Sequence, residues 1–158
     1  MGSEPVTGKS GLTRQAAAYG LGVMTLLNFV NYIDRYVLPA VAPRIKDALS
    51  LTDTELGFLG SAFLFSYFLT SPIFGWLGDR FSRTKLMAAG VAVWSLATAG
   101  GGLARNLGQM LFARGAVGVG EASYAAISPA LLSDYYPPER RGRVFAVFYL
   151  AIPVGSAV

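Results

Sequence analysis

The chain has 158 residues, of which 53% are hydrophobic and only 14% are charged, and its mean hydropathy is +0.47. A soluble domain of ordinary composition carries about 25% charged residues, so this composition predicts a surface solvated largely by lipid. Because the chain contains neither Cys nor His, disulfide frameworks, thiol nucleophiles, soft-metal sites and His-based catalysis are excluded. The net charge of +4 comes from basic residues at the ends of apolar runs. We therefore expect no nucleic-acid partner, no metal and no cofactor.

Apolar runs of membrane-spanning length follow one another along the chain. A spanning helix needs about 20 mostly apolar residues, and uncharged stretches occupy 15–33, 56–78 and 86–104. A fourth apolar run, 106–136, carries internal charges, and a fifth ends with the sequence at Val158. The pattern predicts an all-α membrane protein with a flexible cytoplasmic tail over 1–13 and a partial transmembrane half over 14–158. The predicted helices occupy about 17–43, 53–78, 84–104, 107–136 and, cut short, 143–158.

The basic residues predict how these helices are oriented, because short cytoplasmic loops carry an excess of Lys and Arg. Loops and ends on one side of the membrane hold eight basic residues, and those on the other side hold three. We therefore expect the N-terminus and the loops at 79–85 and 134–143 in the cytoplasm, in a multi-pass protein of the inner or plasma membrane. Since the fifth run is too short to cross a bilayer, we expect a longer transporter or channel whose C-terminal half follows. The alternative is a chain that has been cut short.

Local signals mark where the second helix begins and where the fourth helix packs. Thr52 and Glu55 have the spacing of a capping box, in which each side chain bonds the backbone N–H of the other residue. The second helix should therefore begin near Asp53. Small residues recur at every fourth position of the fourth helix, at Gly118, Ala122, Ala126 and Ala130. Such a face allows another helix to approach closely.

Four ionisable residues fall inside the predicted spans, and they are Asp34, Arg35, Arg114 and Glu121. Each costs about 2.5–3.5 kcal/mol near the bilayer centre, so four unpaired charges would cost on the order of 10 kcal/mol. That total is comparable with the whole stability of a domain. The residues should therefore pair or face a water-filled cavity. We predict a polar cavity between the first and fourth helices, and the alternative is a static clamp that joins them.

Glu121 is the predicted site of proton coupling. Burial disfavours the charged form of a carboxyl group, so a Glu at this depth can take up and release a proton.

An intramembrane enzyme would need a nucleophile with a base or metal ligands. Ser123 is two positions from Glu121, and residues at i and i+2 do not face each other on a helix. We therefore expect no enzymatic activity.

The segment 75–85, with the sequence GWLGDRFSRTK, joins the second and third predicted helices. Gly75 is followed four residues later by Asp79-Arg80 and then by Arg83. This pattern resembles the G-x-x-x-D-[RK]-x-G-[RK]-[RK] loop of the major facilitator superfamily. Ser82 takes the place of the usual glycine, and one residue separates the last two basic positions. The turn could therefore differ a little from that of the superfamily.

The resemblance implies roles for the charges of this loop. In the superfamily, the loop aspartate and arginine belong to a cytoplasmic charge network that favours the outward-facing state. Carried over, Asp79 and Arg83 would have those roles, with Asp134 at the inner end of the fourth helix as the partner of Arg83.

Three further strings resemble the spinster family within that superfamily. They are NYIDR at 31–35, RGAVGVGEASY at 114–124 and FYLAIPVGS at 148–156. The resemblance implies twelve helices in two six-helix halves, each half built from inverted three-helix repeats whose first helices line the cavity. This chain would supply the first four to five helices of the N-terminal half. Spinster members with assigned substrates are associated with export of lysolipids and sphingosine phosphates.

We therefore expect a secondary active transporter that moves an amphiphilic anionic lipid across the bilayer by alternating access, coupled to protons. Arg35 and Arg114 suit a phosphate head group, because Arg offers forked donors to its oxygens. Five aromatic residues of the second helix either wall the lipid tail or pack in the ordinary way, and they are Phe58, Phe63, Phe65, Tyr67 and Phe68. The alternatives are a proton-driven organic-anion symporter, which carries a string similar to that at 31–35, and a non-transporting scaffold or channel subunit.

Overall fold

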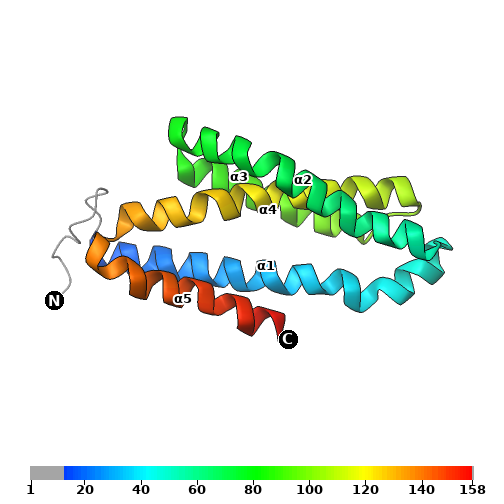
Figure 1. The fold of residues 1–158 in the computed structure, drawn as a ribbon, viewed down its shortest axis with the longest axis horizontal. Coiled ribbons are helices and arrows are strands. Elements are labelled where there is room, and N and C mark those ends of the chain that lie inside the picture. Colours follow the sequence, from blue (N-terminus) through cyan, green and yellow to red (C-terminus); the bar gives the residue numbers. More distant parts are fainter. Residues whose placement is uncertain (1–12, 158) are drawn as a thin grey trace. The chain divides into compact units, whose positions relative to one another are not determined.

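A computed structural model describes residues 13–157, and this part of the chain consists of five α-helices joined by short loops (Figure 1). The helices are α1 (Arg14–Leu49), α2 (Asp53–Arg80), α3 (Arg83–Gly101), α4 (Leu107–Tyr135) and α5 (Pro138–Ser156). The predicted all-α fold is confirmed. By length and composition, α1 and α2 are suited to crossing a membrane. The flexible tail expected over 1–13 lies, apart from Thr13, outside the described residues.

Two helices extend at one end by more than three residues beyond the predicted range. α1 continues to Leu49, past the expected end at residue 43, and α5 begins at Pro138, before the expected start at residue 143. Hydropathy marks only the lipid-immersed part of a helix, whereas the backbone hydrogen bonds continue into charged segments at its ends. Proline also favours the first turn of α5, because its fixed φ suits a helix and its missing N–H would have no partner there.

The capping box at the start of α2 is confirmed. The Thr52 hydroxyl accepts a hydrogen bond from the Glu55 backbone N–H at 3.2 Å, and the Glu55 carboxylate accepts one from the Thr52 N–H at 2.8 Å. These two bonds satisfy backbone donors that would otherwise lack partners at a helix start. α2 therefore begins at Asp53, as predicted, and Asp53 forms an ion pair with Lys46 at the end of α1.

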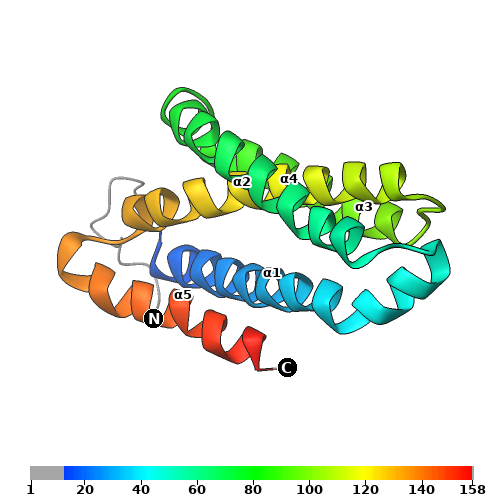
Figure 2. The same ribbon diagram turned by 45° about the vertical axis from the view of Figure 1, so that its right-hand side comes forward.

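The described chain divides into two compact units, and the first comprises residues 13–39 and 128–157. In it α5 runs beside α1 in the same direction (Figure 2). The Asn28 side-chain amide donates to the Phe148 carbonyl oxygen at 3.0 Å. Gly155 allows the close approach further along, because a Cβ atom at this position would lie 2.9 Å from the Phe29 carbonyl oxygen.

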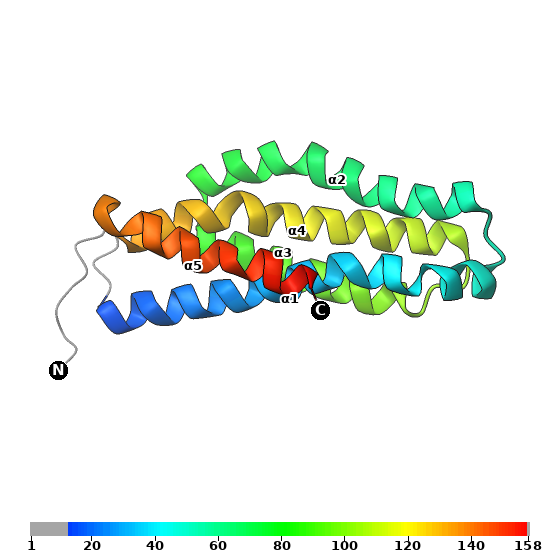
Figure 3. The same cartoon turned by 60° about the horizontal axis from the view of Figure 1, so that its bottom comes forward.

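The second unit comprises residues 40–127 and packs α4 against both α2 and α3. Figure 3 shows α2 running beside α4. A Cβ atom at Gly118 would lie 2.5 Å from the Phe63 carbonyl oxygen of α2, and one at Gly120 would lie 2.5 Å from the Gly90 carbonyl oxygen of α3. Small residues on two faces of α4 therefore bring both neighbours close, whereas the sequence pattern had pointed only to the face of Gly118. Phe63 and Trp94 belong to the buried core of this unit.

Candidate functional site

The two charges of α1, Asp34 and Arg35, lie in the first unit, and both are half-buried. The Arg35 guanidinium carbon lies 5.3 Å from the centroid of the Tyr32 ring, one turn earlier on the same helix. A cation over an aromatic face is stabilised by about 0.5–1 kcal/mol when exposed and by about 2 kcal/mol or more when desolvated. The Tyr32 ring therefore stabilises the positive charge of Arg35 within α1.

Two buried asparagines of α1 were not among the predicted site residues. Asn28 and Asn31 are 5% and 4% exposed, and Asn28 bonds the backbone of α5. With Arg35 they occupy positions i, i+3 and i+7, which share one face of a helix. This spacing of polar residues inside an apolar run was the signal that could have identified them.

The two charges of α4, Arg114 and Glu121, lie in the second unit. Arg114 is half-buried, and its guanidinium carbon lies 5.1 Å from the centroid of the Phe63 ring on α2. Glu121 is only 1% exposed. Seven residues make nearly two turns, so the two side chains start from one face of α4 about 10 Å apart along its axis.

Each unit therefore contains two of the four predicted charged residues. Asp34 and Arg35 are neighbours on α1, and Arg114 and Glu121 share a face of α4. The gathering of all four around one cavity stays a prediction.

The predicted charge network at 75–85 contains an ion pair within the second unit. Arg83 donates from Nη2 to the Asp79 carboxylate and from Nε to the Gly78 carbonyl oxygen, each at 3.1 Å. One guanidinium thus binds both the carboxylate and a backbone carbonyl near the end of α2. The guanidinium of Arg80 lies over the Trp76 ring, 3.9 Å from its centroid.

The replacement of the usual loop glycine by Ser82 fits the local backbone. Ser82 has φ −62°, an angle that any residue adopts, so this turn does not need the usual glycine. A Cβ atom at Gly75 would meet nothing within 4 Å. Asp134 is half-buried in the first unit, and its pairing with Arg83 stays a prediction.

Among residues 13–157, no group of three acidic residues is arranged to hold a metal ion.

Arg141, which the sequence indicated only as a basic loop residue, has a structural role at the end of α4. Its Nη2 donates to the Ser133 carbonyl oxygen at 2.7 Å, and its Nε donates to the Tyr136 carbonyl oxygen at 3.1 Å. The side chain therefore satisfies carbonyls at the end of α4, as Arg83 does for α2. In both cases Nε bonds the carbonyl oxygen five residues earlier.

The five aromatic residues of α2 do not lie on one face. Phe63 is buried, and Tyr67 packs against it with ring centroids 5.9 Å apart. Phe58, Phe65 and Phe68 are 53%, 69% and 82% exposed. Phe63 and Tyr67 therefore pack in the interior of the second unit, and the wall for a lipid tail stays a prediction.

Comparison with known proteins decides the family. The family model described as Major Facilitator Superfamily matches residues 24–158. This chain belongs to the major facilitator superfamily. As a member, it is a membrane-embedded protein, in agreement with its composition and with the two helices suited to crossing a membrane.

Within the superfamily, the chain is similar to spinster proteins. It is 39% identical to protein spinster homolog 1 of Homo sapiens over 151 residues, which cover 94% of this chain and 29% of that protein. It is 34% identical to the sphingosine-1-phosphate transporter SPNS2 of Xenopus tropicalis, with 92% of this chain and 29% of that protein covered. The chain thus spans less than a third of the length of these relatives.

A solved structure shares the fold. It is the inward-facing, unoccupied conformation of a bacterial homolog of the human lysosomal transporter spinster. The TM-score is 0.85 at 31% sequence identity, and the match covers 90% of this chain and 30% of that one. The five helices therefore correspond to part of a major facilitator fold, as the resemblance implied.

Proposed function

We propose that this chain is part of a secondary active transporter that moves an amphiphilic, anionic lipid across a membrane by alternating access. The observation that carries the proposal is Glu121, a buried acid on the face of α4 that also bears Arg114. Supporting it, one relative is described as a sphingosine-1-phosphate transporter. The substrate would be a lysophospholipid or a sphingosine-phosphate-like molecule, and the N-terminus and the loop at 79–85 would face the cytoplasm.

Each unit would offer one half-buried arginine as a donor to an anionic head group. Arg35 and Arg114 each lie over an aromatic ring, which supports their positive charge inside apolar helices. Forked N–H donors match the oxygens of a phosphate, and such charge-assisted bonds are about twice as strong as neutral ones. No covalent step is required of the protein, so the proposal involves no enzymatic activity.

Glu121 would couple transport to protons through its charge. Two unit charges about 10 Å apart interact by about 2 kcal/mol at an effective dielectric constant of about 20. Deprotonated Glu121 would therefore compete electrostatically with the substrate for Arg114 and favour release, whereas protonation would favour binding. The membrane potential adds about 2.3 kcal/mol per charge for each 100 mV.

A second candidate is a proton-driven organic-anion symporter of the same superfamily. The NYIDR string at 31–35 favours it, because similar strings occur in such symporters. A third is a non-transporting scaffold or channel subunit. Substrate counterflow separates a carrier from a channel, because only a carrier exchanges faster when substrate is present on both sides. Competition between lysophospholipids and small organic anions separates the two carriers.

The experiment that tests the proposal uses the protein that contains this chain, reconstituted in proteoliposomes. We expect lysophospholipid transport to depend on an imposed pH gradient, and Glu121→Gln to abolish that dependence while substrate binding persists. Glu55→Gln is the matched control, because it removes an exposed carboxylate at a position where a capping box also accepts Gln. Unchanged pH dependence in Glu121→Gln would remove the coupling role. Absence of counterflow with every lysolipid and organic anion would remove the transport proposal.

A further inference from the structure

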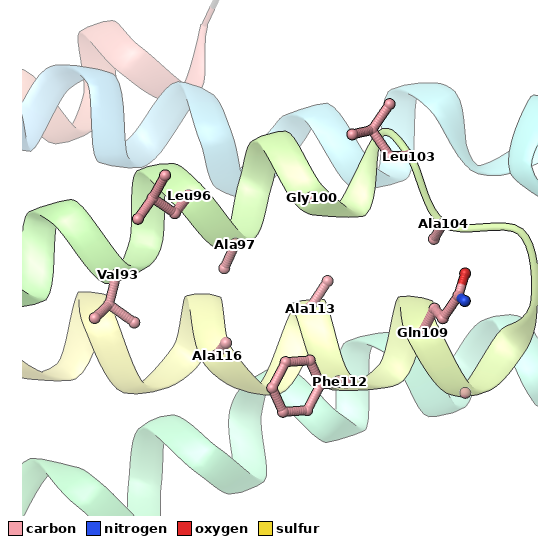
Figure 4. A pocket seen from close by; sticks show the side chains of 11 residues that line it. Val93, Leu96, Ala97, Gly100, Leu103, Ala104, Gln109, Phe112, Ala113 and Ala116 are labelled. Carbon is pink, nitrogen blue, oxygen red and sulfur yellow. The ribbon is translucent and has the colours of Figure 1, made fainter.

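An apolar groove lies between α3 and α4 in the second unit, beside the loop that joins them (Figure 4). Its volume is about 790 Å³, within the range of about 300–1,000 Å³ that is typical of small-molecule sites. Alanine and glycine line much of it, and three large residues at its edges, Leu96, Leu103 and Phe112, are 74%, 80% and 80% exposed. The groove is therefore shallow, apolar and open along one side.

The length of the groove matches one leaflet of a bilayer. It begins at Val93, near the middle of α3, and ends where Ala104 and Gln109 meet the loop. Val93 to Gly101 spans about 12 Å at about 1.5 Å per residue, close to half of a hydrocarbon core about 30 Å thick. A further transmembrane helix packed here would need a groove along the whole span, whereas this groove stops near the middle of α3.

The loop end of the groove is polar and positively charged. Gln109 lines the groove, and its side-chain oxygen accepts a hydrogen bond from the Arg105 backbone N–H at 2.8 Å. The Gln109 N–H in turn donates to the Asn106 side chain at 2.9 Å. Arg105 is exposed directly after the lining residue Ala104. An exposed cation therefore lies at the loop end of the apolar groove.

We propose that this groove binds one acyl chain of an anionic bilayer phospholipid, with the phosphate at Arg105. The one-leaflet length and the charge at the loop end favour this occupant over a protein helix. Arg114 and Glu121, which are assigned to transport, are not among the residues that line the groove. The inference goes beyond the proposed function and does not depend on it, because a non-transporting membrane protein could carry the same groove.

Native mass spectrometry tests whether the apolar groove binds an acyl chain. The detergent-solubilised protein is titrated with palmitoyl-oleoyl phosphatidylglycerol. Gly100→Leu places a side chain in the groove, and Gly60→Leu makes the same change on α2; an added Cβ atom meets nothing within 4 Å at either position. We expect Gly100→Leu to weaken binding about tenfold, the loss when two methylene contacts disappear, and Gly60→Leu to leave it unchanged. Equal weakening in both variants, or in neither, would overturn the proposal.

Two further measurements test the charge and the occupant. Arg105→Gln should weaken phosphatidylglycerol binding and leave phosphatidylcholine binding unchanged, with Arg44→Gln as the control. A spin label at Gly100→Cys, introduced into a chain without native Cys, should be accessible to oxygen from the lipid phase in vesicles of either lipid. Shielding of that label by another segment or by a second copy of the protein would overturn the proposal. An affinity of Arg105→Gln for phosphatidylglycerol equal to that of the wild-type protein would also overturn it.

Discussion

The Arg114 guanidinium lies over the ring of Phe63, with its central carbon 5.1 Å from the ring centroid. Phe63 is 6% exposed, so the ring presents a desolvated face, where a cation–π contact reaches about 2 kcal/mol or more. The contact joins α4 to α2 at the position where Gly118 lets the two helices approach. A packing residue of α2 therefore positions the arginine that the proposed function assigns to the head group.

Phe63→Leu should weaken substrate binding while the fold persists. The substitution keeps an apolar side chain but removes the aromatic face, and a loss of about 1–2 kcal/mol corresponds to about 5- to 30-fold in affinity. A binding titration with lysophospholipid measures it. Phe68→Leu, at a position 82% exposed on the same helix, is the control. Equal affinities in the two variants would show that the ring does not position Arg114.

Two glycine substitutions should change stability in opposite directions. A Cβ atom at Gly120 would lie 2.5 Å from the Gly90 carbonyl oxygen, whereas one at Gly60 would meet nothing within 4 Å. Gly120→Ala should therefore destabilise the protein by about 1–3 kcal/mol through overpacking. Gly60→Ala should stabilise it by up to about 1 kcal/mol, the difference in helix propensity. Thermal unfolding in detergent measures both, and a shift of the same sign would contradict the packing described for α4.

Arg83→Lys should reduce transport more than it reduces stability. Asp79 is 76% exposed, and an ion pair at such a position contributes at most about 1 kcal/mol. Lysine keeps the charge but cannot bind the Asp79 carboxylate and the Gly78 carbonyl with one planar fork. We expect at least a tenfold slower rate in proteoliposomes, about 1.4 kcal/mol in the barrier. Arg143→Lys is the control, and equal rates in the two variants would remove Arg83 from the conformational network.

Arg141→Gln should loosen the end of α4. The guanidinium bonds two backbone carbonyls, at Ser133 and Tyr136, and a hydrogen bond from a charged donor contributes about 1.5–3 kcal/mol when it is protected from water. Because the side chain is half-buried, we expect a loss near the lower value and faster amide hydrogen exchange over the last turn of α4. Arg140→Gln, at the exposed neighbouring position, should leave the exchange unchanged. Equal exchange in the two variants would contradict this role.

Glu55 should make stability depend on pH in the acid range. Hydrogen bonds from the Thr52 backbone N–H and then from its hydroxyl lower the pKa of Glu55 below its ordinary value of 4.5. A carboxyl group whose pKa is lower in the folded state stabilises the fold fully above its unfolded pKa, and this contribution is lost as pH falls through the folded pKa. Between about pH 6 and pH 3, the melting temperature of Glu55→Gln should therefore fall less than that of the wild-type protein. If the melting temperature fell equally in Glu55→Gln and in wild type, the capping box would not be the source of the acid dependence.

The sequence by itself determined the features that depend on neighbouring residues in the chain. The apolar runs predicted the helices, because a span needs a continuous apolar length. The spacing of Thr52 and Glu55 predicted the start of α2, since a capping box closes within one turn. The position of Glu121 inside an apolar run identified it as a candidate, because an acid is costly at that depth.

Only the tertiary structure decided which faces of these helices meet. It showed that Gly120 as well as Gly118 is a contact point of α4, that Phe63 is buried while Phe68 is exposed, and that Arg141 bonds the end of α4. In a membrane protein the lipid-facing and buried faces of a helix are equally apolar, so helix association depends on small residues and shape rather than on hydropathy. For this reason the pattern of apolar residues identified the spans but could not identify their partners.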